Sequence, residues 1–281
     1  MRELLVGGTF SVVVLVLLLI FAVIGWPGAP DPCIHDTSTG GANTCWCEHF
    51  DPAAIGRPGV RQPFNTWSNL MALLYGGIVG LGVWWTRKHQ GPSGANRMRS
   101  NQIYSLTYIC VVIFLGLGSM WFHASITAWG GVVDQLSMYT FANFLLVYSI
   151  ARVIPRDAPD WPVYLGYGFL TALLTVLGAS LHLEALPISA LLIAIVVLVY
   201  AFFEGYIGFA RPDVRSDWVG YVAFYIPSVI AFGLAMLVWA MSQSGRPWCD
   251  PHAAFQLHGL WHWLAGITSV LLYFYWRRAR G

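Results

Sequence analysis

The chain has 281 residues, of which 57% are hydrophobic and only 10% are charged, and its mean hydropathy is +0.61. Soluble domains carry roughly a quarter of charged residues, so this composition excludes an ordinary soluble domain and indicates a protein embedded in a membrane. The formal net charge of +2 gives no support for nucleic-acid binding, and we expect no nucleic-acid partner.

Eight apolar runs are long enough to cross roughly 30 Å of hydrocarbon as helices. None of them shows the alternation of polar and apolar residues that a strand would require, so helices are the expected spanning elements. The predicted fold class is therefore all-α, a polytopic transmembrane helix bundle. The runs lie at about 4–25, 65–86, 102–122, 131–152, 161–181, 185–207, 218–241 and 253–276.

The first run has two interpretations. Arg2, an apolar stretch and the sequence Gly25-Trp26-Pro27-Gly28-Ala29 together resemble a cleaved signal sequence. A length of about 22 residues favours an uncleaved transmembrane anchor instead. We therefore divide the chain into an N-terminal anchor or signal sequence at 1–25, an extracytoplasmic segment at 26–64 and a seven-helix core at 65–281.

The basic residues of the loops predict the orientation. If every run spans, 12 of the 15 Lys and Arg residues lie on one side, which the positive-inside rule assigns to the cytoplasm together with both termini. Glu204, near the inner end of its run, could pair with Arg211 or reach the interface. Short loops and the lack of an organelle signal indicate a bacterial inner membrane. The basic residues of the inner side are Arg2, Arg87, Lys88, Arg97, Arg99, Arg152, Arg156, Arg211, Arg215, Arg277, Arg278 and Arg280.

Four of the five cysteines fall in segments that we predict to lie outside the cell. An oxidising environment favours two disulfides among them, with three possible pairings. We favour Cys47–Cys249, which would attach the outer segment to the entrance of the last helix, with Cys33–Cys45 closing a local loop. Cys110, in mid-membrane, is interpreted as a small apolar packing residue.

The last run begins with Gln256-Leu257-His258-Gly259-Leu260-Trp261-His262. Two imidazoles four residues apart project from one face of a helix, where they can share one metal ion. An isolated pair at this spacing is more often polar surface or a pair of satisfied core histidines. The position of this pair inside a membrane helix favours a functional role, because ionisable groups are costly there.

The third and fourth runs add three candidate groups. His123 ends the third run, with Ser119 one turn earlier on the same face, and Asp134 lies in the opening turn of the fourth. Because successive spans alternate in direction, we expect these groups and the pair His258 and His262 at the same outer depth. Taken alone, Asp134 could be a carboxylate favoured by a helix N-terminus, and Ser119 a hydroxyl bonded to its own helix.

Together these residues predict a hydrolytic metal site. Three neutral histidines with an open fourth position are the usual catalytic arrangement for zinc, which lowers the pKa of bound water and polarises a carbonyl. Asp134 could take a proton from that water and deliver it to a leaving amine, and Ser119 could stabilise the oxyanion. Inside a membrane, such a site suits hydrolysis of an acyl bond in a lipid.

At the level of motifs, the chain resembles the alkaline ceramidases, which belong to a superfamily of seven-helix membrane hydrolases that includes progestin and adiponectin receptors and GPI-lipid remodelling proteins. The resemblance runs from about residue 45 to the end and makes the first run an extra helix. It is carried by Trp46-Cys47-Glu48, Phe64-Asn65-Thr66-Trp67-Ser68-Asn69-Leu70, Gly118-Ser119 with His123, Asp134, and His258-x-x-x-His262.

The resemblance implies a ceramidase-like function: cleavage of the amide bond of ceramide or a related N-acyl lipid to a fatty acid and a sphingoid-type amine. It implies that Ser119 and Asp134 are catalytic and that Cys47–Cys249 is the family's disulfide. The active site would face the extracytoplasmic side, and a membrane lipid would be the substrate. The implied zinc ligands are His123, His258 and His262.

The chain departs from the family at its calcium site. Cys45, Phe50 and Gln62 occupy positions of expected ligands, which leaves Glu48 as the possible residual one. Hard cations need several oxygen ligands, so we do not expect calcium to bind. Two alternatives stay open: an ester-cleaving lipid hydrolase of the same superfamily, and a non-catalytic seven-helix lipid receptor with a structural zinc. No protein partner is indicated.

Overall fold

The computed structural model describes residues 2–33, 46–90, 96–155, 157–180 and 188–280. Within these ranges the regular elements are all helical, apart from two isolated β-bridges, which confirms the all-α fold class. The long helices are α1 (Arg2–Ile24), α3 (Met71–Gln90), α5 (Gln102–Ser125), α6 (Ala128–Val153), α7 (Trp161–Ser180), α8 (Ile188–Ala210), α10 (Ile226–Met241) and α11 (Leu257–Arg277). The short ones are η2 (Pro52–Ala54), α2 (Pro63–Ser68), α4 (Arg97–Ser100), α9 (Trp218–Gly220) and the π-helical turn η3 (Tyr221–Tyr225).

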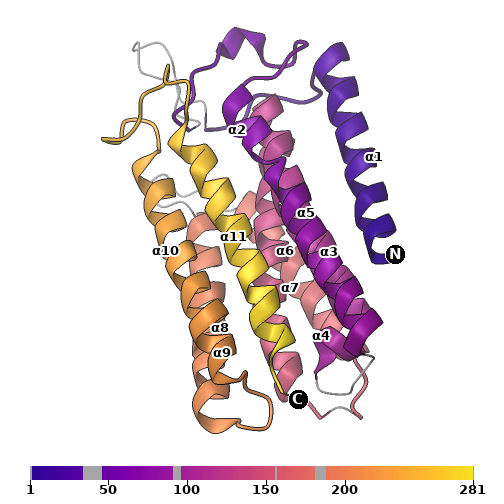
Figure 1. Ribbon diagram of the computed structural model, residues 1–281. Helices are drawn as coiled ribbons and strands as arrows, with labels where there is room; N and C mark the ends of the chain where they lie inside the picture. The colour runs from indigo at the N-terminus through magenta and orange to yellow at the C-terminus, as the bar shows by residue number, and fades with distance from the viewer. Residues whose placement is uncertain (1, 34–45, 91–95, 156, 181–187, 281) are drawn as a thin grey trace.

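Seven helical stretches of the described chain are long and apolar enough to cross a membrane, so the protein is a multi-pass membrane protein. They are α1, α2 with α3, α5, α6, α7, α8, and α9 with η3 and α10. The eighth expected span corresponds to α11, which has a comparable length of 21 residues. Its histidines, tryptophans and tyrosines make it less apolar than the others, but it runs through the bundle beside α10 and α3 (Figure 1).

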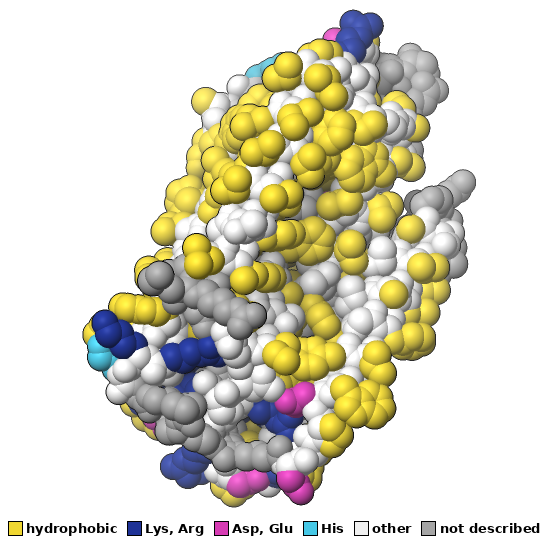
Figure 2. Space-filling view, turned by 90° about the vertical axis from the view of Figure 1, so that its right-hand side faces the viewer, with side chains coloured by type: hydrophobic (Ala, Val, Ile, Leu, Met, Phe, Trp, Pro, Cys, Tyr) yellow, Lys and Arg dark blue, Asp and Glu magenta, His cyan; other side chains and the backbone are white. Residues whose placement is uncertain are grey.

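Polar and apolar surfaces are separated along the bundle. Apolar side chains cover the flank shown in Figure 2, and most of the Lys and Arg residues visible there gather toward its lower end. The last turns of α3, α6 and α11 carry Arg87, Arg152 and Arg277 at this end. The loops before α2 and α11 lie at the opposite end (Figure 1). These three arginines and the start of the histidine-bearing helix are therefore at opposite ends of the bundle, which we call the inner and the outer end after the predicted orientation, itself still a prediction.

Close helix contacts position α5 at the centre of the bundle. A Cβ atom on Gly116 would lie 2.2 Å from the Cβ of Ala72 on α3, and one on Gly118 would lie 2.6 Å from the Cβ of Ser137 on α6. Only glycine allows backbones to approach so closely. The outer half of α5, which carries Ser119 and His123, is thus held between two neighbouring helices.

The extra helix α1 packs on α3 and α5. Leu18 is fully buried, and Phe10 makes an edge contact with Phe114 of α5. Beyond its outer end, the Trp26 ring lies 5.7 Å from that of Trp121, and Trp26 Nε1 donates a hydrogen bond to the Gly59 carbonyl. Helix α1 therefore has specific packing partners, while its retention in the mature protein stays a prediction.

The inner end of the bundle contains a buried ion pair that differs from the expectation for Glu204. Its carboxylate pairs with Arg152, at 2.7 Å, and not with Arg211, which pairs with Asp213. The side chains of Arg152 and Glu204 are 1% and 0% exposed. Glu204 thus points into the bundle toward α6, because a buried partner is available there.

Candidate metal centre

The three predicted histidine ligands converge. His123 lies near the end of α5, and His258 and His262 occupy the first two turns of α11. One possible ligand atom from each lies within 4.8 Å of the others, and the three residues are 0%, 2% and 9% exposed. His123 and the α11 pair, 135 or more positions apart in the sequence, therefore form one buried cluster with the spacing of a metal site.

A hydrogen bond from His123 to Gln62 orients the His123 ring. Gln62 Nε2 donates to the Glu48 carbonyl at 2.9 Å, which turns its Oε1 toward His123 Nδ1 at 2.6 Å. Because an amide oxygen only accepts hydrogen bonds, His123 Nδ1 carries the proton. The other ring nitrogen, Nε2, is buried without a partner among the described residues. A lone pair is thus presented to the cluster, as metal-ligating histidines require.

Ser68 orients His262 in the same way. Its hydroxyl donates to the Asn65 carbonyl at 2.9 Å and lies 2.7 Å from His262 Nδ1. A hydroxyl has one proton, so Ser68 accepts from Nδ1–H and leaves the lone pair on Nε2. His262 Nε2 lies 3.3 Å from Ser119 Oγ. Helix α2 therefore supplies the group that fixes the tautomer of a residue on α11.

His258 is held differently. No hydrogen bond from the described residues orients its ring, and its Nδ1 is buried without a partner. The indole of Trp46 stacks on it, with ring centroids 4.3 Å apart and an interplanar angle of 21°. Packing, in place of hydrogen bonding, thus determines how this imidazole lies.

The donor set fits a divalent metal ion. Unpartnered buried nitrogens are costly, and this cluster contains two of them, His123 Nε2 and His258 Nδ1. Three neutral imidazoles are typical ligands of zinc and related borderline metals, and no carboxylate belongs to the group. The cluster could therefore hold a metal ion with positions left for water or substrate.

Ser119 connects this cluster to Asp134. Both side chains are nearly buried, at 7% and 8% exposure, and the Ser119 hydroxyl interacts with the Asp134 carboxyl. Helix α6 begins at Ala128, three residues before the predicted start, so Asp134 lies in its second turn and not in the opening one. Its carboxyl is therefore less coupled to the helix N-terminus than expected and is directed to the neighbourhood of Ser119.

Glu48 has a structural role in the outer segment. Its carboxylate oxygens accept hydrogen bonds from the backbone N–H groups of Phe64, at 2.7 Å, and Asn65, at 2.8 Å, and so cap α2. Burial raises the pKa of Glu48, and the two hydrogen bonds oppose that rise. Its assignment as a residual calcium ligand stays a prediction, as does the expected lack of calcium binding.

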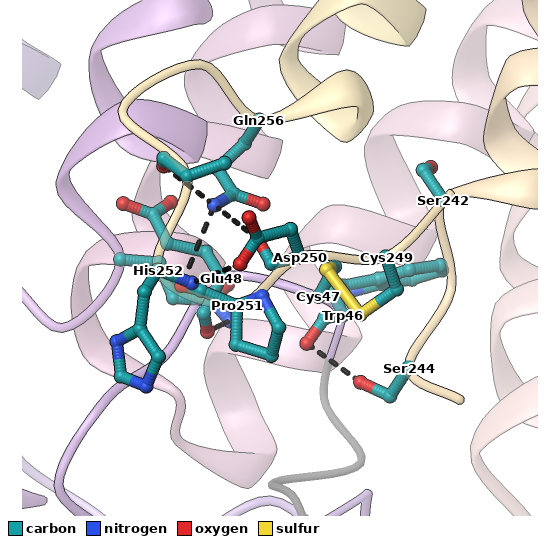
Figure 3. The surroundings of a disulfide bond; sticks show 12 residues. Trp46, Cys47, Glu48, Ser242, Ser244, Cys249, Asp250, Pro251, His252 and Gln256 are labelled. Atoms are coloured by element: carbon teal, nitrogen blue, oxygen red, sulfur yellow. Dashed lines mark hydrogen bonds between the residues drawn. A yellow bond between two sulfur atoms is a disulfide. The ribbon is translucent and has the colours of Figure 1, made fainter. Parts of the chain in front are cut away.

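The disulfide Cys47–Cys249 is confirmed and joins the outer segment to the loop before α11 (Figure 3). Cys45 lies outside the described residues, so its pairing with Cys33 stays a prediction. Cys110 is a free, partly buried cysteine, as interpreted from the sequence.

Three residues that orient the histidine rings were not identified as such from the sequence: Trp46, Gln62 and Ser68. Gln62 was noted only as a departure from the family's calcium site, and the other two only as parts of family motifs. Their location in or near the family motifs was the only signal in the sequence that they have a role at the site. Their histidine partners could not be inferred, because these lie 61 to 212 positions away along the chain.

Comparison with known proteins agrees with this geometry. No curated protein matches the chain. A family model described as Ceramidase matches residues 42–280, a range that contains all three histidines, Ser119 and Asp134 and leaves α1 outside. Since the match covers most of the chain and includes the whole buried cluster, the protein belongs to the ceramidase family.

Proposed function

We propose that this protein is a zinc-dependent intramembrane hydrolase that cleaves the amide bond of ceramide or a related N-acyl lipid. The products are a fatty acid and a sphingoid-type amine. The observation that carries the proposal is the buried cluster of three histidines within the family match. Membership in the ceramidase family supports a lipid amide as the substrate, and the histidine donor set supports zinc as the metal.

The residues around the cluster have separate tasks in this reaction. Zinc held by His123, His258 and His262 would supply Lewis acidity and lower the pKa of a water molecule. Asp134 accepts a proton from the attacking water as the carbon–oxygen bond forms, and gives it to the amine nitrogen as the carbon–nitrogen bond breaks.

Ser119 is placed to stabilise the oxyanion. Its hydroxyl lies 3.3 Å from His262 Nε2 and interacts with Asp134, so it lies between the cluster and the proposed base. A hydrogen bond from this hydroxyl to the carbonyl oxygen strengthens as negative charge develops on that oxygen. Burial of the whole group excludes bulk water and increases the electrostatic effect.

The depth of the site suits a lipid substrate. His123 is close to one end of α5 and His258 to the same end of α11, so the cluster lies near one end of the membrane-spanning helices. The amide of a ceramide lies close to its headgroup, at the same level of a bilayer. The distribution of basic residues supports an extracytoplasmic location for this end.

The decisive experiment compares the detergent-purified wild type with Asp134→Asn and His258→Ala. We expect about one zinc per chain in the wild type and in Asp134→Asn, and little in His258→Ala. Release of fatty acid from N-acyl-sphingosine should fall by about 10² to 10⁴-fold in Asp134→Asn, as for loss of a general acid–base. His258→Ala should lose hydrolysis together with the metal.

Two results would lead to other functions. Faster fatty-acid release from a glycerolipid ester than from N-acyl-sphingosine would identify an ester hydrolase. Zinc present in the wild type without hydrolysis of any acyl lipid would contradict an enzymatic function and favour a lipid receptor with a structural metal.

A further inference from the structure

Trp46 has a backbone conformation that needs support. Its φ angle is +61°, one of two positive values among the described residues other than glycine. A bulky side chain in this region costs free energy, so surrounding contacts must hold it. Such contacts are present at both the backbone and the side chain of Trp46.

Two bonds attach the Trp46 backbone to the loop before α11. Ser244 Oγ donates a hydrogen bond to the Trp46 carbonyl at 2.8 Å, and the adjacent Cys47 is bonded to Cys249 (Figure 3). Close by, His49 N donates to the Pro251 carbonyl at 3.0 Å. The backbone of Trp46 is therefore anchored to the same loop that leads into His258.

The indole held in this way lies against the metal cluster. It stacks on His258 at 4.3 Å, with Trp239 of α10 5.7 Å away and His123 6.4 Å away. His123 and His262 each have a hydrogen bond at Nδ1 that orients the ring, whereas His258 has none from the described residues. The indole therefore orients His258 by stacking, whereas Gln62 and Ser68 orient the other two histidines by hydrogen bonds.

We propose that Trp46 is a positioning residue for His258, and that the Cys47–Cys249 disulfide acts on the metal site through it. This inference rests on the zinc site of the proposed function. Stacking limits rotation of the imidazole and keeps its nitrogen aimed at the metal before the metal binds. Removal of the indole, or of the bond that holds its backbone, lowers zinc affinity without removing a ligand.

The test is the zinc affinity of the full-length protein in detergent, measured by competition with a chromogenic chelator. We expect Trp46→Leu to weaken zinc binding by about 10-fold, the lower end of what outer residues around metal ligands contribute. Trp46→Phe keeps an aromatic plane and should lose less. Trp248→Leu is the matched control, because Trp248 lies beside Cys249 on the outer surface, is 47% exposed and should leave affinity unchanged.

The role of the disulfide is tested by combining variants. Cys47→Ala with Cys249→Ala should weaken zinc binding when Trp46 is present and should add little in the Trp46→Leu background. Thermal unfolding of the metal-free proteins separates positioning from general destabilisation, and the absorption bands of bound cobalt(II) should change in Trp46→Leu if the ligand geometry is altered.

The outcomes distinguish this inference from the proposed function. Wild-type zinc affinity in Trp46→Leu, with zinc-dependent hydrolysis intact, would overturn the role of Trp46 and leave the enzyme assignment in place. Equal losses from removing the disulfide with and without Trp46 would overturn the coupling. A wild type that binds no zinc would overturn both the inference and the zinc site on which it rests.

Discussion

Two buried polar clusters lie at opposite ends of the bundle, and they differ in how completely their atoms are paired. At the inner end, the Glu204 carboxylate accepts hydrogen bonds from Ser149, Arg152 and Tyr275, at 2.6 to 3.0 Å. At the outer end, His123 Nε2 and His258 Nδ1 are buried without partners among the described residues.

This difference separates a structural cluster from one prepared to bind a ligand. Buried polar groups in folded proteins are nearly always paired, since an unpaired one costs about 1–3 kcal/mol. The inner cluster pairs both carboxylate oxygens of Glu204 and the two terminal nitrogens of Arg152, leaves only Arg152 Nε of this ion pair without a partner among the described residues, and ties α6, α8 and α11 together. The outer cluster leaves two buried imidazole nitrogens without partners among the described residues, in a group whose possible ligand atoms lie within 4.8 Å of one another, an arrangement that a metal ion would stabilise. Buried polar groups thus stabilise the fold at one end and are suited to bind a metal ion at the other.

The largest effect on stability is expected from Glu204→Gln. It leaves the Arg152 charge, 1% exposed, without a counter-ion, and breaking a buried pair in this way costs about 3–5 kcal/mol. Chemical unfolding in detergent micelles measures the loss. The zinc content of the protein that remains folded should equal that of the wild type, because the two clusters are at opposite ends of the bundle.

A double variant provides the control for this prediction. Arg152→Met with Glu204→Met removes both charges and should recover most of the stability, because apolar residues of similar volume replace buried ion pairs well. A loss below about 1 kcal/mol in Glu204→Gln would contradict a structural role for the pair, since that range is typical of exposed pairs.

A smaller effect is expected at Gln62, because the orientation of His123 depends on its hydrogen bond to this residue. Gln62→Leu removes the acceptor that keeps the proton on His123 Nδ1, and should weaken zinc binding by about 10 to 100-fold. Gln62→Glu retains an acceptor at this position and is the matched variant, with a smaller loss. Chelator competition measures both affinities, and equal affinity in Gln62→Leu and the wild type would show that the tautomer is fixed by other means.

Sequence patterns predicted the helices and a common depth for the candidate site residues, but not the contacts that orient those residues. Helix periods and apolar lengths are local properties, so the positions of His123, His258 and His262 along their helices could be inferred before the fold was known. The partner of Glu204 could not, because Arg211 is close in the sequence whereas Arg152 becomes close only when α6 packs on α8.

The outer segment shows the same limit. Motif resemblance indicated the disulfide and the ligands, but the roles of Trp46 and Gln62 arise from tertiary contacts made by irregular backbone. Such backbone has no periodicity from which a facing direction could be derived. Sequence reasoning therefore missed contacts that form only in the tertiary structure, both at Trp46 and Gln62 in the irregular segment and at Glu204 inside α8.

The smallest effect is expected at the exposed pair of Arg278 and Asp217, which gives a reference for the buried pair. Both side chains are 39% exposed, so Arg278→Gln should cost less than about 1 kcal/mol near neutral pH.

The hydrogen bond from Arg278 lowers the pKa of Asp217 in the folded protein. The contribution of this pair to the free energy of unfolding is therefore fully present above the unfolded pKa of Asp217, about 3.9, and is lost as the pH falls through its lower pKa in the folded protein. Unfolding measured at pH values falling from 7 to below about 3.9 should show the difference between wild type and variant shrinking, and high salt should reduce it at neutral pH. A difference that does not change with falling pH or with salt would mean that Arg278 contributes by packing and not by its charge.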